Sequence, residues 1–170
     1  MSDLTPVMFT TAEAIRGCIG MSNADIPTDR LLSQHLSIAL SIDLESWYSG
    51  DYMQDWVDSG FDPVYGAFDQ SMENTSVDKH KGYLLSLYSM WFGAYHCIMA
   101  PTSVTQMYSD GENKSQRFGG YKHSELISVV KSNLKKYRNL LIEANNGDTS
   151  YTVLGPSSVG SSHPDPVTGQ

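Results

Sequence analysis

The sequence predicts a mainly α-helical protein, a small bundle of helices in one domain, and three observations lead to this expectation. Apolar residues recur at helical spacing over residues 27–48, 83–99 and 121–145. Glycine and proline residues stand between these segments and separate the helices from their connections. The chain has 170 residues, 40% of them hydrophobic, which is enough for one domain with a core and too short for two.

Two helices are expected in the N-terminal part of the chain. Thr10-Thr11 followed by Glu13 indicates the start of a short helix, because threonine caps free amides and an acid suits the positive end of a helix. Gly20 ends this helix. Pro27, which the first turn of a helix tolerates, begins a longer one that continues to Trp47. The predicted core stripe of the longer helix is Leu32, Leu36, Ala39, Leu40 and Trp47.

The longer helix carries a second apolar stripe, which consists of Leu31, Ile38 and Ile42. A helix that is apolar on two sides must bury both of them. One side is therefore expected to face the core. We predict that the other side, with these three residues, faces a neighbouring subunit.

Residues 50–78 differ from the segments around them and are predicted to form an irregular acidic insertion. Aromatic residues are interleaved with the acids, which argues against plain disorder. A long irregular segment in a compact domain is typical of a binding loop. The ligand pattern of a calcium loop is absent, so a solvated acidic surface is favoured over a metal site or an acid–base pair. The acids expected to be displayed by this loop include Asp55, Asp58, Asp62 and Asp69.

The most apolar segment, Tyr83 to Met99, predicts a central helix that ends at Ala100-Pro101. Asp110-Gly111 is a turn signal in the segment that follows. Residues 104–108 and 115–118 lie on either side of this turn and are expected to form a short β-hairpin.

The last helix is expected over residues 121–145, where Asn146-Gly147 ends it. Residues 1–147 then form the helical domain, and residues 148–170 form an extended C-terminal arm. The arm is rich in serine, glycine and proline and cannot fold alone. It either stays unfolded or becomes ordered on a partner, for example as an added strand. In the second interpretation the contacts with the partner come from Tyr151, Val153, Leu154, Val159 and Val167.

The net charge of −8 is unevenly distributed along the chain. Residues 1–78 carry 13 acidic and 2 basic side chains, a net charge of −11, whereas residues 79–147 carry 4 acidic and 9 basic side chains, a net charge of +5. In an assembly, such polarity orients head-to-tail contacts or repels DNA from a surface. The basic cluster of the last helix contacts DNA phosphates, contacts an acidic neighbouring subunit, or is a solvated helix face. It consists of Lys131, Lys135, Lys136 and Arg138.

The sequence has no pattern that predicts a catalytic residue, a metal site or a cofactor. The five histidines are scattered, and Cys18 and Cys97 form no CxxC pair. His96 and Cys97 are adjacent, but consecutive helix positions point in different directions. No apolar run approaches the roughly 20 residues of a membrane span. The first residues resemble neither a secretory signal nor a transit peptide, so a protein made in a cytoplasm and without a membrane partner is expected.

The order of the first elements resembles a known family. Met8-Phe9-Thr10-Thr11 leads into Ala12-Glu13-Ala14-Ile15, and Gly20 ends the first helix. The second helix runs from Asp29-Arg30-Leu31-Leu32 to Trp47-Tyr48. This arrangement is similar to the N-terminal part of the head–tail connector family of tailed bacteriophages, the helical adaptor or head-completion proteins.

The resemblance covers residues 8–145 as an order of elements and implies a structural virion protein without a catalytic role. It implies a ring of identical subunits, about twelve, that docks beneath the portal and continues the DNA channel to the tail or nozzle protein. The arm would extend onto the portal or an adjacent subunit. The acidic insertion would face the tail side or the lumen, where negative walls let DNA pass without sequence-specific binding. The protein would be located in the virion neck.

Other functions remain open at this stage. A different tail-completion protein of a phage would have a similar sequence and would differ in its partner. A small helical DNA-binding or regulatory protein would use the basic last helix, although the acidic total charge argues against strong non-specific DNA binding. An enzyme has the least support, because no nucleophile, base or metal set is recognisable.

Overall fold

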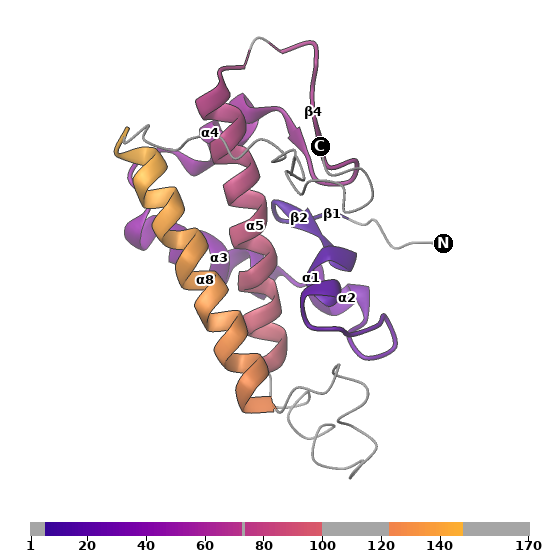
Figure 1. Ribbon diagram of the computed structural model, residues 1–170. Coiled ribbons are helices and arrows are strands. Elements are labelled where there is room, and N and C mark those ends of the chain that lie inside the picture. The colour runs from indigo at the N-terminus through magenta and orange to yellow at the C-terminus, as the bar shows by residue number, and fades with distance from the viewer. Residues whose placement is uncertain (1–5, 73, 100–122, 148–170) are drawn as a thin grey trace, which may run out of the picture.

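The computed structural model describes residues 6–72, 74–99 and 123–147, and α-helices account for most of them (Figure 1). The prediction of a mainly helical protein is confirmed. The hairpin expected within residues 104–118 and the C-terminal arm of residues 148–170 lie outside the described residues.

An N-terminal hairpin and the first helix form one continuous unit. Strands β1 (Pro6–Val7) and β2 (Thr10–Thr11) pair antiparallel, with Met8 at φ 56° in the turn between them. Helix α1 (Ala12–Cys18) follows directly, and the Thr11 hydroxyl accepts a hydrogen bond from a first-turn amide at 3.2 Å. The predicted threonine cap is therefore confirmed, and the hairpin adds to the predicted elements.

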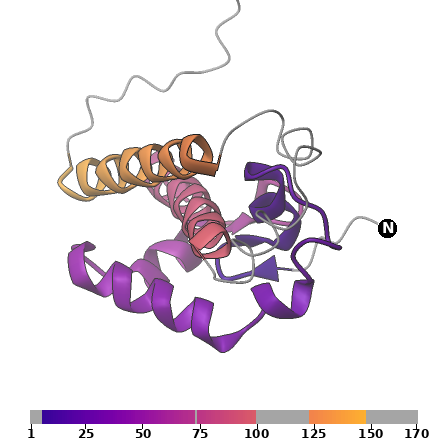
Figure 2. The same cartoon turned by 90° about the horizontal axis from the view of Figure 1, so that it is seen from below.

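The single helix predicted for residues 27–48 is wrong, because the structure has two helices there. Helix α2 (Thr28–Leu31) and helix α3 (Gln34–Trp47) are separated by Ser33, whose backbone is extended at φ −61° and ψ 137°. The side chain of Ser33 makes no capping hydrogen bond to α3. The chain therefore changes direction between the two helices (Figure 2).

This break changes which leucines face the core. Leu31 is fully buried, whereas Leu32 is 48% exposed. In an unbroken helix, Leu32 would share the buried side with Leu36, four residues further on. Leu31 is therefore a core residue, and its predicted place in a subunit interface is wrong.

Residues 50–78 contain regular secondary structure, so the prediction of an irregular insertion is wrong. Helix α4 (Tyr52–Ser59) begins after Asp51, whose carboxylate accepts hydrogen bonds from two first-turn amides. Gly60 ends the helix in the left-handed conformation, at φ 59°. Asp51 and Gly60 thus mark the start and the end of a short helix. The many acids and glycines of the segment make this helix difficult to predict from the sequence.

A second hairpin follows α4 and is attached to the core by aromatic rings. Strands β3 (Phe61–Asp62) and β4 (Ala67–Phe68) pair antiparallel. The Phe61 ring lies 5.9 Å from the Trp56 ring, 5.1 Å from the Phe68 ring and 5.9 Å from the Tyr83 ring, measured between centroids. Three of the aromatic residues interleaved with the acids, Trp56, Phe61 and Phe68, therefore pack on one another, whereas Tyr65 is exposed.

The two long helices lie antiparallel beside each other (Figure 1). Helix α5 (Ser76–Met99) begins at Ser76 rather than at the predicted Tyr83, because a capping pair precedes it. The Asp78 amide donates to the Thr75 hydroxyl, and the Asp78 carboxylate accepts from the Thr75 amide, both at 3.2 Å. Helix α8 (His123–Asn145) corresponds to the last predicted helix.

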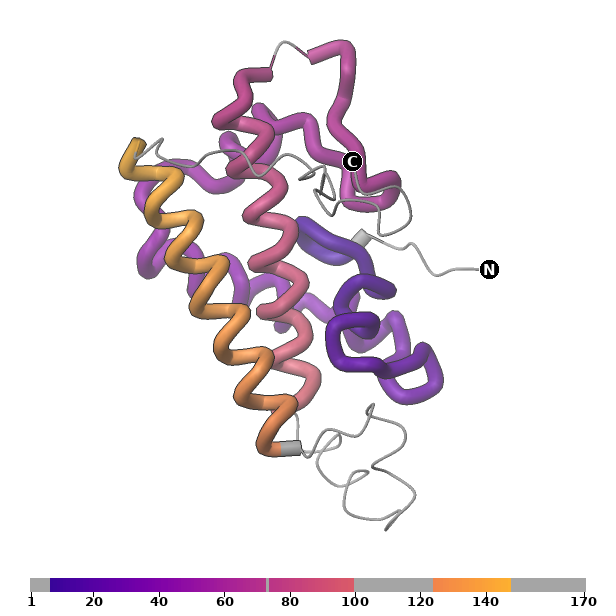
Figure 3. The backbone as a smooth tube through the Cα atoms, viewed as in Figure 1, coloured from indigo at the N-terminus to yellow at the C-terminus, as the bar shows by residue number. Residues whose placement is uncertain are grey.

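Helix α5 lies at the centre of the fold and contacts α1, α3, α4, α8 and strands β2 and β3. The tube of Figure 3 shows α8 along one side of α5 and α1 along another. Figure 2 shows α3 and α8 on either side of α5. This placement buries residues around most of the circumference of α5, including Leu84, Leu85, Tyr88, Phe92, Ala94, Cys97 and Ile98.

Two glycines of α5 allow neighbouring elements to approach its backbone closely. A Cβ atom added at Gly82 would lie 2.0 Å from Ser59 Oγ, and one added at Gly93 would lie 2.7 Å from Ile15 Cδ1. Ser59 and Ile15 are both fully buried. The absence of side chains at these two positions therefore determines how α4 and α1 pack on α5.

Replacing Gly82 with alanine is expected to lower the free energy of unfolding by about 1–3 kcal/mol, because the buried Ser59 has no room to move. The matched control is Gly17→Ala in α1, where an added Cβ meets no atom within 4 Å. This control is expected to leave stability unchanged or to raise it by up to ~1 kcal/mol. Urea unfolding followed by circular dichroism measures both variants, and equal stability would contradict the close crossing of α4 and α5.

Candidate functional site

Helix α3 is apolar on two sides, but the described residues cover only one of them. Leu36, Leu40 and Leu44 are buried, whereas Ile38 and Ile42 are 52% and 63% exposed. Ile38 and Ile42 lie one turn apart on the same helix face, and we name this pair the α3 outer face. Single exposed isoleucines are ordinary on protein surfaces, but two consecutive turns form a continuous apolar strip. The assignment of this strip to a subunit interface stays a prediction.

A half-buried carboxylate links α3 to α5. Asp43 accepts a hydrogen bond from Trp47 Nε1 at 2.9 Å and another from the Tyr88 hydroxyl of α5. The guanidinium of Arg138, on α8, lies 4.9 Å from the centroid of the Trp47 ring. Asp43 thus joins α3 to α5, and Arg138 of α8 packs on the Trp47 ring that the same carboxylate binds. These contacts hold the α3 outer face away from the core.

A second carboxylate joins the end of α3 to α4 and α5. Asp55 accepts a hydrogen bond from the Tyr48 hydroxyl at 2.7 Å and lies 3.3 Å from Lys81 Nζ. Asp55 was expected in an acidic loop facing a lumen or the tail, and the structure corrects this expectation. Its carboxylate faces inward because two donors from neighbouring helices satisfy it there.

The other three predicted acids lie at exposed positions and make local hydrogen bonds. Asp58 accepts from Gln54 Nε2 at 2.7 Å, one turn away on α4. Asp62 and Asp69 accept from backbone amides two residues further on, each at 2.8 Å. The hydrogen bonds from Ser71 hold the pKa of Asp69 below its usual value. These three acids form the solvated acidic surface that the sequence favours over a metal site.

The Tyr48 and Tyr88 phenols are predicted to make the protein sensitive to alkaline pH. Burial, and then the hydrogen bond to an aspartate, raises the pKa of each phenol above the ordinary value of 10.0. In the unfolded chain a phenol loses its proton near pH 10, whereas in the folded chain it keeps it. The folded state then binds more protons, so the free energy of unfolding should fall as pH rises above about 10.

The Tyr88→Phe variant separates this effect from general alkaline unfolding. It should be less stable by about 1–2 kcal/mol at neutral pH, because Asp43 loses a buried donor. Its stability should then fall less steeply with pH than that of the natural protein in urea titrations between about pH 8 and about pH 11. The control is Tyr65→Phe, since Tyr65 is 82% exposed. An identical slope in all three proteins would contradict the assigned pKa shift.

The basic cluster of α8 is partly used inside the molecule. Lys131 Nζ lies 5.9 Å from the Tyr95 ring centroid, and Lys136 Nζ lies 5.5 Å from the Tyr137 ring centroid. Arg138 is held over the Trp47 ring. The three lysines, Lys135 included, are exposed. A role of these lysines in contacts with DNA phosphates or a neighbouring subunit stays a prediction.

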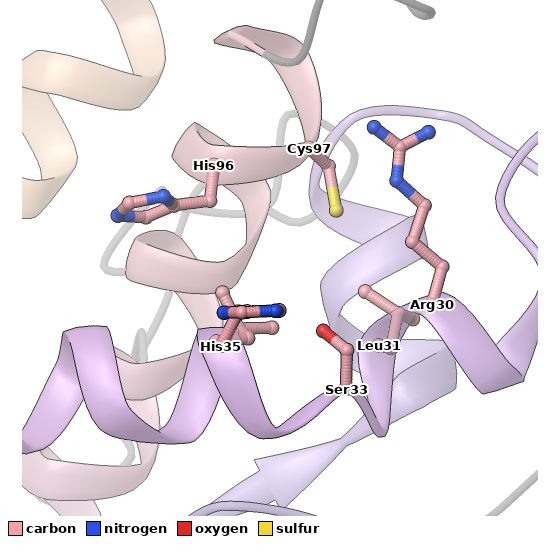
Figure 4. Close-up of a pocket in the computed structure, with 7 residues that line it drawn as sticks. Arg30, Leu31, Ser33, His35, His96 and Cys97 are labelled. Atoms are coloured by element: carbon pink, nitrogen blue, oxygen red, sulfur yellow. The ribbon is translucent and has the colours of Figure 1, made fainter.

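A pocket of about 180 Å³ lies where the end of α2, the start of α3 and the end of α5 meet (Figure 4). Burial raises the pKa of the Cys97 thiol to about 11, against the opposing effect of Arg30 and then Arg16. The thiol is therefore protonated at neutral pH and is a poor nucleophile. Among residues 6–72, 74–99 and 123–147, no three histidines, cysteines or acids are placed to hold a metal ion. The pocket is lined by Arg30, Leu31, Ser33, His35, Leu36, His96 and Cys97.

The sequence contains a signal for the contacts of Asp43 and none for the pocket. Asp43 lies between Leu40 and Leu44 and four residues before Trp47. A carboxylate beside an apolar stripe needs hydrogen-bond partners, so this position predicts a polar contact. The pocket brings together His35 and His96, which lie on different helices and share no sequence pattern. Only the fold reveals it.

Comparison with protein-family models, with curated proteins and with solved structures gives no match to this chain. In the part of the chain that the structure describes, no helix is both long and apolar enough to cross a membrane.

Proposed function

We propose that this protein is a non-catalytic, ring-forming head–tail adaptor of a tailed bacteriophage. It docks under the portal, continues the DNA channel toward the tail, and is located in the virion neck. The order of elements that resembles the connector family supports the choice of this assembly. The observation that carries the proposal in the structure is the α3 outer face, which is apolar and open to solvent although α3 already has a complete core side.

Assembly into a ring would bury the α3 outer face. Ile38 and Ile42 remain exposed in the isolated chain, and contact with another subunit removes their apolar surface from water. The rigid junction at Asp43 presents both residues without any rearrangement of α3. A subunit with such a face stays folded as a monomer and gains stability when the ring forms.

The distribution of charge supports a role beside DNA in transit. Asp58, Asp62 and Asp69 are exposed acids on α4 and its following segment. Acids that face a channel reduce non-specific binding of the DNA that passes through it. The partners of the ring are then a portal on one side and a tail or nozzle protein on the other.

Ile42→Asp is expected to weaken ring assembly by roughly 100-fold or more, because an unpaired carboxylate would be buried in an apolar interface. Ile38→Asp should behave in the same way. The matched control is Val57→Asp on α4, since Val57 is 57% exposed but lies on another helix. Light scattering of the protein alone, and then with purified portal protein from the same genome, measures assembly. Rings that form normally with both isoleucine variants would place the interface elsewhere.

Deleting residues 148–170 is expected to abolish attachment to the portal while leaving the helical domain folded. The spaced apolar residues of the arm, in a context that cannot fold alone, motivate this expectation. Co-sedimentation with emptied capsids measures attachment, and circular dichroism confirms that helix content is retained. Unchanged attachment would exclude the arm as the portal contact.

A small DNA-binding or regulatory protein is the second candidate, and the exposed lysines of α8 favour it. A gel shift that weakens steeply with salt, together with indifference to portal protein, would support this candidate over the adaptor.

A further inference from the structure

The pocket between α2, α3 and α5 is rich in hydrogen-bond donors. Arg30 comes from α2, Ser33 from the link between helices, His35 from α3 and His96 from α5 (Figure 4). Leu31 and Leu36 add apolar surface, and none of the described lining residues carries a carboxylate. Side chains that can donate hydrogen bonds therefore come to one small pocket from three separate elements.

The Arg30 guanidinium makes no hydrogen bond or ion pair with any residue in the described ranges 6–72, 74–99 and 123–147. Its charge is felt within the pocket, because it lowers the pKa of the Cys97 thiol against the larger effect of burial. A guanidinium has five donors in a planar fork that matches the oxygens of a carboxylate or phosphate. An oxyanion is thus the chemical group that would satisfy this side chain.

The start of α3 also favours the binding of an anion. Its first turn contains no acidic residue, and the Ser33 side chain does not cap it. The free amides of a helix start carry partial positive charge and accept anions. The Ser33 hydroxyl and the His35 ring, both in the pocket lining, stand at this helix start.

Two other uses of the pocket fit less well. A metal ion would need a group of ligands that the described residues do not supply, and the Arg30 charge would repel it. Nucleophilic chemistry would need a thiolate, whereas the Cys97 thiol is protonated at neutral pH. Binding of an anion requires only the donors that are already in place.

We propose that this pocket binds an oxyanion group, a carboxylate or a phosphate, through Arg30, Ser33, His35 and His96. At about 180 Å³ the pocket has room for such a group. The group comes either from a free anion or from an acidic side chain of a second copy of the chain. His35 lies one turn before Ile38, so the pocket adjoins the α3 outer face and is within reach of a second copy bound there. Only the second source, an acidic side chain of a second copy, rests on the proposed function.

Nuclear magnetic resonance titration of the full chain with inorganic phosphate, and separately with acetate, tests the pocket directly. Saturable shifts of the amides of Ser33 and His35 are expected, and Arg30→Gln should weaken binding roughly tenfold or more. The matched control is Lys135→Gln, which removes an exposed cation of α8 and should leave binding unchanged. Linear shifts without saturation, or equal shifts in natural protein and Arg30→Gln, would overturn the proposal.

Two further measurements complete the test. His35→Gln provides a second variant with the same expected weakening, should Arg30→Gln fail to fold. Light scattering with added phosphate then separates the sources of the anion. If a second copy supplies a carboxylate, phosphate and Arg30→Gln both reduce self-association; if the ligand is a free anion, self-association is unaffected while the titration still saturates. The titration does not require ring formation, so failure of the adaptor proposal would leave its result intact.

Discussion

The apolar circumference of helix α5 is the constraint on which the remaining structure depends. A helix that is apolar around most of its circumference must be covered there, and α1, α3, α4 and α8 each cover part of it. Gly82 and Gly93 allow two of these elements to approach the α5 backbone, where a methyl group would overlap buried side chains. The helices around α5 are therefore arranged mainly by their contacts with α5 rather than with one another.

Within this apolar arrangement, the hydrogen bonds of Asp43 set the rotation of α3 about its axis, which hydrophobic burial alone does not set. Apolar contacts alone would allow α3 to rotate about its axis with little loss, because it is apolar on two sides. A half-buried carboxylate is costly unless donors satisfy it, and the Tyr88 hydroxyl of α5 can donate to Asp43 only when α3 turns this side toward α5. The exposure of Ile38 and Ile42 thus follows from a polar contact on the opposite side of the same helix.

The sequence predicts the long helices well, because residues 83–99 and 121–145 repeat one apolar stripe over several turns. It fails at Ser33, since adjacent leucines at 31 and 32 fit either phase of the stripe, and only the folded structure shows that the first of them is buried. It also misses α4, although its cap and its glycine stop are present, because acids and glycines dominate that segment. The exposed isoleucines could be found by periodicity, whereas the pocket depends on two helices that meet only in the fold.

The charge pattern of the described residues has a consequence for the geometry of the proposed ring. A two-fold contact brings the same patch of both subunits together, so only residues close to the two-fold axis meet their own copies, and like charges placed there would repel. A head-to-tail contact instead places an acidic surface of one subunit against a basic surface of the next. Head-to-tail contacts close into rings when the rotation between subunits permits it. A head-to-tail ring would therefore use both features: the exposed acids of α4 would lie against the lysines of α8 of the next subunit, and the apolar strip of α3 would be buried between subunits.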